Sequence, residues 1–206
     1  PINGIMGMLD IIRKNRQDEA KVDDCLDKIN LSASHLLALV NDVLNMNKLE
    51  SGKETIESVS FDLAHLMDDV SSLVNAQITE MGITHRTHRG ELTHTRLIGS
   101  PLRLRQIMLN LFSNAIKYNK PGGMIDTYAG EVSCDGTRVV YEFRITDSGI
   151  GMSSEFIEKE LFHPFTQEKS GARTQYKGTG LGMSIVKELI EKMQGTIEVT
   201  SQQGVG

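Results

Sequence analysis

The sequence predicts an α+β protein: an N-terminal antiparallel helical hairpin, half of a dimeric four-helix bundle, followed by a two-layer α/β sandwich. Up to about residue 50, apolar side chains recur at alternating steps of three and four residues, which is typical of helices packed side by side. Beyond that point, amphipathic helical segments are interspersed with short strand-like ones. The change falls at Ser51-Gly52, so we expect a dimerisation hairpin over residues 1–52 and a ligand-binding sandwich over residues 53–206.

The hairpin is expected from two apolar stripes that a polar stretch separates at residues 14–19. Two helices joined by a short polar turn pack antiparallel. Alone, such a hairpin buries only one face of each helix, so pairing with a second copy would complete the core. The alternative is a linker or coiled-coil spacer. The two stripes consist of Ile2, Ile5, Leu9 and Ile12, and of Val22, Leu26, Ile29, Ala33, Leu36, Val40 and Val43.

The sandwich is expected from helical and strand-like periodicities that turn residues separate. Asp62 is a candidate N-cap, Pro101 suits the first turn of a helix, and Asp135-Gly136 suits a hairpin turn. Helices interspersed with a mostly antiparallel sheet form two layers. The expected helices cover residues 62–79, 101–118, 153–160 and 181–193, and the expected strands cover 83–88, 95–98, 124–133, 137–146 and 196–200.

Composition excludes several classes of protein. The formal net charge of −5 argues against a nucleic-acid binder, whose phosphate contacts need a basic surface. No apolar run approaches the roughly 18 residues of a membrane span. Cys25 and Cys134 are expected to be free thiols in a reducing compartment, the cytoplasm. A zinc site at His85, His88 and His94 is not expected, because no acid or cysteine lies near them in ligand spacing.

A polar stripe marks the expected helix at residues 101–118. It contains two asparagines one turn apart, although asparagine is a mediocre helix former. An asparagine oxygen can ligate a hard cation, and its amide can donate to phosphate. From this helix alone, a solvated face and a ligand-binding face remain equally open. The stripe consists of Arg103, Gln106, Asn110, Asn114 and Lys117.

Two glycine-containing turns are the other candidate ligand segments. Asp147 stands at the end of a hydrophobic strand, where its carboxylate could accept a hydrogen bond from the amino group of adenine, and Gly149 and Gly151 would let the backbone approach closely. Residues 178–182 lead directly into a helix, whose free N–H groups and positive dipole end suit phosphate. An ordinary turn and a flexible loop are the alternatives. The polar stretch at 168–177 suits a mobile lid.

The order of these segments resembles that of the sensor histidine kinases, most closely the hybrid kinases that carry their own receiver domain. Residues 109–118 resemble the family's asparagine box, 147–151 its first glycine box, 161–165 its phenylalanine box and 178–182 its second glycine box. Residues 1–5 and 44–53 resemble parts of its dimerisation helices. The resemblance therefore covers nearly the whole chain and implies the ATP-binding (Bergerat) fold of histidine-kinase ATPases.

The resemblance also implies ligands and roles. Asn114 would ligate the Mg²⁺ that bridges the ATP phosphates, and Asn110 and Lys117 would contact the phosphates or nearby solvent. All three would be catalytic groups. Tyr118 would lie against adenine, Asp147 would bind its amino group, and two glycines would shape the base pocket. The second glycine box would wrap the triphosphate. The glycines of the base pocket are Gly149 and Gly151. The second glycine box consists of Gly178, Thr179, Gly180, Leu181 and Gly182.

The resemblance further implies a homodimer formed through the hairpin, a response regulator receiver domain as partner, no nucleic acid, and no membrane contact by this chain. The parent protein would be a membrane-anchored sensor. The family's phosphoacceptor histidine would stand five residues before Pro1, and its last strand would follow Gly206, so this chain alone is not expected to phosphorylate itself. Gly99-Ser100-Pro101 replaces the family's Gly-Asp-Pro and is expected to alter only a helix cap. A gyrase-like or chaperone-like ATPase and a degenerate scaffold are the rival interpretations.

Overall fold

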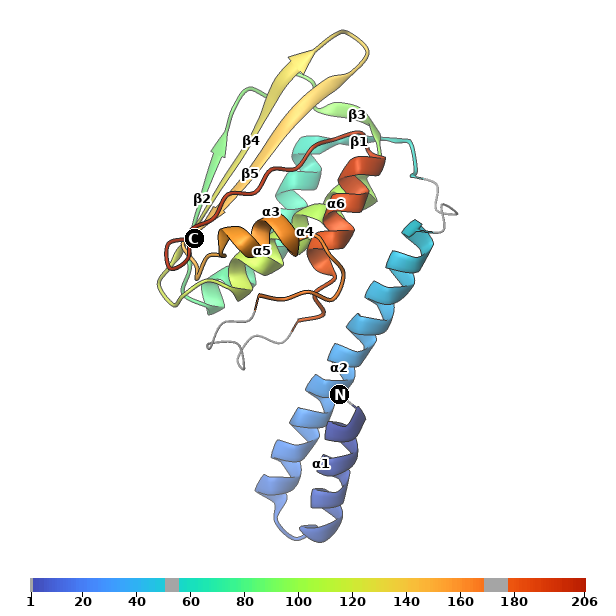
Figure 1. Ribbon diagram of the computed structural model, residues 1–206, viewed down its shortest axis with the longest axis vertical. Helices are drawn as coiled ribbons and strands as arrows, with labels where there is room; N and C mark the ends of the chain where they lie inside the picture. Colours follow the sequence, from blue (N-terminus) through green and yellow to red (C-terminus); the bar gives the residue numbers. More distant parts are fainter. Residues whose placement is uncertain (1, 51–55, 169–177) are drawn as a thin grey trace. The chain divides into compact units, whose positions relative to one another are not determined.

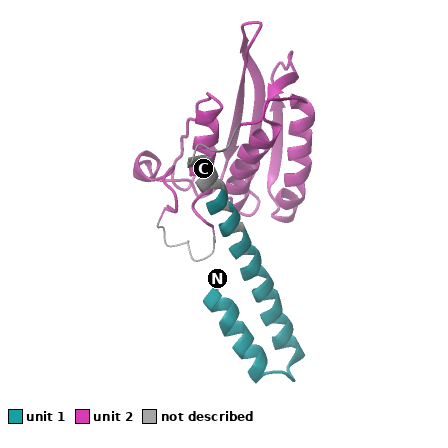
Figure 2. Ribbon diagram, turned by 90° about the vertical axis from the view of Figure 1, so that its right-hand side faces the viewer, with its two compact units in different colours: residues 1–53 teal, residues 54–206 magenta. Residues whose placement is uncertain are grey.

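The computed structural model describes residues 2–50, 56–168 and 178–206, and the chain forms two compact units, residues 1–53 and 54–206 (Figure 2). Each unit has its own packing and is described separately. The expected domain boundary at residues 52–53 lies outside the described residues, as does nearly all of the expected lid. None of the described helices is both long and apolar enough to span a bilayer.

The first unit is the predicted hairpin, made of α1 (Ile2–Lys14) and α2 (Glu19–Glu50), which lie side by side in Figure 1. Asn15 ends α1, because its side-chain amide donates to the Ile11 carbonyl at 2.8 Å. α1 buries no residue, and in the described part of α2 only Cys25 is fully buried. The hairpin thus leaves apolar side chains exposed, namely Ile2, Met6, Leu9, Leu26, Leu31, Leu37, Val40, Val43 and Leu44.

The second unit places helices on one side of a sheet (Figure 1), as the sequence predicted. β2 (Thr84–Arg89) pairs in parallel with β4 (Met124–Cys134), which pairs antiparallel with β5 (Val139–Asp147). β1 (Val59–Asp62) and β3 (Arg96–Gly99) form a separate antiparallel pair. The helices are α3 (Leu63–Glu80), α4 (Pro101–Lys117), α5 (Ser154–Lys159) and α6 (Gly182–Lys192).

The core lies between α3, α4 and the inner face of the sheet. Side chains alternate along a strand, so Ile125 and Ala129 of β4 face the helices while Asp126 and Tyr128 face away. The helical side follows the three-to-four spacing of an amphipathic helix. Its buried residues are Leu63, Leu66, Met67, Val70, Val74 and Ile78 from α3, and Met108, Phe112, Ala115 and Ile116 from α4.

Side-chain caps explain where the helices of the second unit begin. Asp62 accepts a hydrogen bond from the His65 backbone N–H at 3.1 Å, which confirms the predicted cap of α3. Ser100 caps α4 by accepting from the Arg103 N–H, and its hydroxyl donates to Glu57. A serine therefore supplies the cap at the position where the family's pattern has aspartate.

The structure differs from the sequence prediction in three respects. Residues 196–200 form no strand in the described structure, whereas residues 59–62 form β1, which was not predicted. β2 and β4 are parallel in a sheet expected to be mostly antiparallel. The physical reason is the same in each case, because a strand exists through the neighbour that pairs with it, and the residues of one segment do not specify that neighbour.

Candidate functional site

The end of α4 lies against the turn that follows β5. The Tyr118 carbonyl accepts a hydrogen bond from the Ile150 N–H at 3.0 Å. A Cβ atom on Gly149 would lie 2.4 Å from the same carbonyl oxygen, so only glycine fits there. The asparagine helix and the Asp147–Gly151 turn, about 30 residues apart in sequence, thus meet in the fold.

Asp147 is the last residue of β5, and one of its carboxylate oxygens accepts a hydrogen bond from the backbone. Its Oδ1 atom accepts from the Gly149 N–H at 2.9 Å, which fixes the orientation of the carboxylate. The Asp147 side chain is half-buried rather than fully exposed. An oriented carboxylate with its second oxygen not engaged by that bond can accept a hydrogen bond from an amino group of a ligand.

The glycine loop at residues 178–182 faces the polar stripe of α4. A Cβ atom on Gly178 would lie 2.2 Å from Lys117 Nζ, and one on Gly182 would lie 4.0 Å from Asn110 Oδ1. Lys117 also donates to the Tyr118 hydroxyl at 2.7 Å, and its ammonium lies 4.4 Å from the Tyr118 ring centroid. The stripe is therefore a face toward the loop rather than only a solvated surface.

The loop itself has a defined shape. Gly180 has a φ of +73° and its carbonyl accepts from the Phe165 N–H at 3.0 Å, which links the loop to the segment after α5. Leu181 is buried, and its N–H donates to the Thr179 hydroxyl at 3.2 Å. The N-cap residue of α6 is Leu181, whose side chain makes no capping hydrogen bond. The first backbone N–H groups of α6 therefore lie beside the loop without a side-chain cap.

Two predicted site residues, Asn114 and Gly151, do not take part in the contacts between α4 and the two glycine turns described above. Asn114 is half-buried one turn after Asn110 on α4, so both amides follow one stripe of the helix. Gly151 has a φ of +63°, and a Cβ atom there would lie 2.0 Å from the Gln202 carbonyl oxygen. Gly151 therefore contacts the C-terminal turn rather than α4.

Asn119 and Ser148 were not predicted, and they connect the site's two sides. Asn119 is only 1% exposed, and its side-chain amide donates to the Met124 carbonyl at 3.1 Å. The Ser148 hydroxyl accepts from the Met124 N–H at 2.8 Å and donates to Asn119 Oδ1 at 3.4 Å. These residues hold the Asp147 turn against the end of α4. A polar residue directly after a helix end was the only sequence signal.

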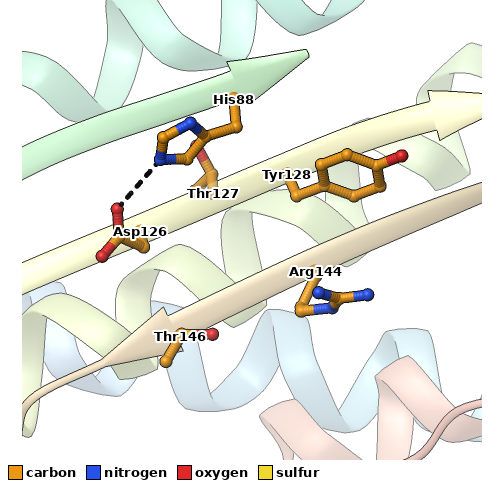
Figure 3. Close-up of a pocket in the computed structure, with 6 residues that line it drawn as sticks. All are labelled: His88, Asp126, Thr127, Tyr128, Arg144 and Thr146. Carbon is orange, nitrogen blue, oxygen red and sulfur yellow. Dashed lines mark ion pairs between the residues drawn. The ribbon is translucent and has the colours of Figure 1, made fainter. Parts of the chain in front are cut away.

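A cavity of about 250 Å³ lies elsewhere, on the face of the sheet away from the helices (Figure 3). His88 and Asp126 lie across it, with 3.5 Å between Nε2 and Oδ1. It contains none of the predicted site residues. His85 lies on the other face, where its Nε2 is 3.2 Å from the Thr127 hydroxyl and burial lowers its pKa. His85, His88 and His94 therefore do not converge on one site.

Comparison with known proteins defines the class of this chain. The family described as histidine kinase-, DNA gyrase B-, and HSP90-like ATPase matches residues 99–206, so the segments that meet at α4 belong to an ATPase domain of that class. The His Kinase A (phospho-acceptor) domain matches residues 1–52. The chain belongs to the sensor histidine kinase family, as the order of its motifs predicted.

Individual relatives agree with this assignment. The chain is 36% identical over 206 residues to hybrid signal transduction histidine kinase B of Dictyostelium discoideum, in a match that covers 100% of this chain and 10% of that protein. It is 35% identical to signal transduction histidine-protein kinase BarA of Escherichia coli K12, where the match covers 100% and 22%. The crystal structure of full-length ShkA in complex with AMPPNP matches with a TM-score of 0.71 and 28% identity, covering 100% and 41%. The chain thus spans less than a quarter of the length of the two curated relatives.

Proposed function

We propose that this chain is the ATP-dependent kinase core of a two-component signalling protein. It would transfer the γ-phosphate of ATP to a histidine of the hairpin domain, from which an aspartate of a receiver domain would take it. One observation carries the proposal: the Asp147 turn and the glycine loop both contact the C-terminal end of α4, which brings a possible adenine acceptor and possible phosphate donors to one helix end.

The base would bind at the Asp147 turn. Asp147 would accept the adenine amino group, and the Tyr118 ring would lie against the base. Gly149 and Gly151 would shape the base pocket indirectly, by letting the turn pack against the backbone carbonyls of Tyr118 and Gln202. The related kinase ShkA was crystallised in complex with AMPPNP, an ATP analogue, which supports an adenine nucleotide as the ligand here.

The phosphates would bind between α4 and the glycine loop. Lys117 would neutralise phosphate charge, Asn110 would donate its amide to a phosphate oxygen, and backbone N–H groups of residues 178–182 would surround the triphosphate. As the histidine nitrogen forms a bond to the γ-phosphorus, the bond from phosphorus to the β–γ bridging oxygen breaks and ADP leaves. These groups therefore act by positioning and by stabilising the transferred charge.

Mg²⁺ fits the donor set of α4. The side-chain oxygen of Asn114 is a hard, neutral ligand on the same stripe as Asn110 and Lys117, and Mg²⁺ in nucleotide sites typically takes few protein ligands beside phosphate oxygens and water. Bound there, the ion would neutralise charge on the phosphates. We therefore assign Asn114 as the protein ligand of Mg²⁺.

The metal and kinase assignments are tested with Asn114→Ala. We expect the variant to lose most of the Mg²⁺-dependent part of ATP affinity, about tenfold, because one ligand and one donor disappear. Calorimetric titration with ATP, with and without Mg²⁺, measures the effect, and Ser113→Ala, on the exposed side of the same turn, is the matched control. An Asn114→Ala protein with an undiminished response to Mg²⁺ would contradict the role.

Phosphotransfer is tested on a protein extended upstream through its own gene. Incubation with γ-labelled ATP should give an acid-labile, base-stable phosphohistidine, which should pass to a receiver domain. The same protein with Asn114→Ala should label far more slowly. Normal ATP binding without any phosphohistidine would instead favour a degenerate scaffold.

The hairpin would pair with a second copy of this chain. Its exposed apolar side chains support this pairing, because two such hairpins can bury them together in a four-helix bundle. We expect Leu26→Asp to weaken association at least tenfold, because it would place a charge in the bundle core. Lys28→Asp, about 200° around the same helix, should change association little. Sedimentation equilibrium over a concentration series measures both, and equal masses for wild type and Leu26→Asp would refute the proposal.

A further inference from the structure

A β-bulge in β4 places Glu131 and Cys134 on the same side of the β4–β5 hairpin. Glu131 pairs with Tyr141 and Ser133 pairs with Val140, so Val132 is an extra residue without a partner on β5. Side chains alternate between faces along a regular strand, so residues three apart normally point in opposite directions. One inserted residue shifts that alternation, and the Glu131 and Cys134 side chains then lie on one face.

The connection between β2 and β3 crosses this face and brings His94 to it. The Glu131 N–H donates to the Glu91 carbonyl at 2.9 Å. In return, Glu131 Oε2 accepts from the backbone N–H groups of Thr93 and His94, at 3.1 Å each. The Tyr141 hydroxyl donates to the His94 carbonyl and lies 3.4 Å from Glu131 Oε2. The carboxylate and the His94 backbone are thereby fixed relative to each other.

Three side-chain atoms that can bind a metal ion lie close together on this face. Glu131 Oε1 lies 2.9 Å from His94 Nδ1, and these two atoms and Cys134 Sγ all lie within 4.8 Å of one another. Hydrogen bonding from His94 lowers the pKa of the Glu131 carboxyl. Glu131 is partly buried, while His94 and Cys134 are exposed, so ions can reach the cluster from solvent.

We propose that His94, Glu131 and Cys134 form a binding site for a borderline divalent cation, with Zn²⁺ as the expected ion. A thiolate, an imidazole and a carboxylate are the three ligand types that zinc combines, and water would take the fourth tetrahedral position. Zinc bonds of about 2.0–2.3 Å require ligand atoms roughly 3.3–3.8 Å apart, which small side-chain rotations from the observed distances provide. Binding converts the Cys134 thiol to a thiolate and releases its proton to solvent, while the His94 tautomer with its proton on Nε2 presents Nδ1 to the ion.

This site is separate from the nucleotide site. Cys134 lies at the hairpin end of β4, whereas Asp147 lies at the opposite end of β5. The 9 residues of β5, Val139–Asp147, span roughly 26 Å of extended strand. Sequence spacing does not reveal the site, because both partners of His94 lie about 40 residues later in the chain.

The test uses Zn²⁺ and Co²⁺ with the reduced 206-residue chain. Competition with a chromophoric chelator should show one tightly bound Zn²⁺ per chain. Co²⁺ should produce the d–d absorption of a tetrahedral site together with thiolate-to-cobalt charge transfer. Mg²⁺ and Ca²⁺ should not displace Co²⁺, because both prefer sites built of oxygen ligands.

Single substitutions identify the ligands. Cys134→Ser should remove the charge-transfer absorption and weaken Zn²⁺ binding at least tenfold, and Glu131→Gln should weaken it similarly. Two controls should bind as wild type: Cys25→Ser, which removes the other thiol, and His88→Ala, which removes a histidine that is also paired with an acid. Wild-type Zn²⁺ affinity in both Cys134→Ser and Glu131→Gln, or no stoichiometric uptake, would overturn the proposed site.

The role of the bulge has its own test. Inserting one alanine between Val140 and Tyr141 of β5 retains all three ligand residues but gives Val132 a partner. The ladder then becomes regular, which should turn Cys134 to the face opposite Glu131 and abolish the thiolate-to-cobalt absorption. Val132→Ala keeps the bulge and should retain the absorption. Circular dichroism checks that both variants fold. A folded insertion variant with an unchanged cobalt spectrum would overturn the proposed geometry.

Discussion

Replacement of Asp147 by alanine is expected to lower ATP affinity by about a hundredfold. The substitution removes an oriented carboxylate acceptor and leaves the adenine amino group unpaired, and a lost hydrogen bond to a charged partner costs about 1.5–3 kcal/mol. It also removes the bond from the Gly149 N–H, which shapes the turn beside the base. Calorimetry with ATP measures the loss, and circular dichroism checks that the variant is folded.

The matched control keeps the shape of the Asp147 side chain. Asp147→Asn retains an oxygen that can accept from the Gly149 N–H, but it offers an amide donor where the carboxylate would accept from adenine. We therefore expect ATP affinity to fall while the turn stays intact, so that the preference for ATP over GTP decreases. Equal binding of ATP and GTP by the unaltered chain would disprove the adenine assignment.

Gly180→Ala is expected to produce the second large effect, a fall in ATP affinity of at least about tenfold. Gly180 has a φ of +73°, and a Cβ atom there would lie 2.8 Å from both the Phe165 carbonyl carbon and the Thr166 carbonyl oxygen. Backbone atoms cannot rotate away as a flexible side chain can, so residues 178–182 must move. Movement of the loop would misplace the N–H groups proposed to bind phosphate, and preorganised donors lose their effect when displaced.

Gly122→Ala is the control that separates two effects of Gly180→Ala: the steric clash of the new Cβ atom and the backbone strain of a positive φ. Gly122 has the same φ of +73°, but a Cβ atom there would have nothing within 4 Å. Both variants should lose about 1–2 kcal/mol of unfolding free energy from an alanine in the left-handed region, but only Gly180→Ala should lose nucleotide affinity. Urea denaturation and ATP titration measure the two effects. Equal ATP affinities for the two variants would contradict the role of the loop.

Local chemistry made most of the fold predictable. Asp62 and Pro101 mark the starts of α3 and α4 in the sequence because caps and proline act on the residues next to them. The Asp135-Gly136 turn was predictable for the same reason, since Asp135 accepts from the N–H groups of Thr137 and Arg138 and Gly136 has a φ of +89°. These hydrogen bonds also lower the pKa of Asp135 to about 2.

Pairing between distant segments was not predictable from one sequence. β1 pairs with β3 across more than 30 residues, and nothing within Val59–Asp62 specifies that partner. Asn119 and Ser148 have a meaning only together, because their hydrogen bond exists once α4 and β5 end side by side. No property of either residue alone distinguishes it from other polar loop residues.

For the proposed nucleotide site, too, some features could be predicted from the sequence and others depend on long-range packing. The spacing of Asn110, Asn114 and Lys117 on one stripe, and the order of the two glycine turns, can be read directly from the sequence because helical periodicity and glycine chemistry are local. That Gly178 lies against Lys117, and Gly149 against Tyr118, depends on the packing of α4 with α6 and with β5. Long-range packing decides which local features meet.

Sequence alone thus determined that this chain has a helical hairpin, a two-layer domain and the ordered motifs of a sensor histidine kinase, because periodicity, caps and turns depend on neighbouring residues. The tertiary structure alone decided which face of α4 meets the glycine loop. It also decided that His94 lies beside Glu131 and Cys134, because an unpaired residue in β4 changes the direction of the side chains after it. That change depends on the register with β5, and register is a property of two strands together.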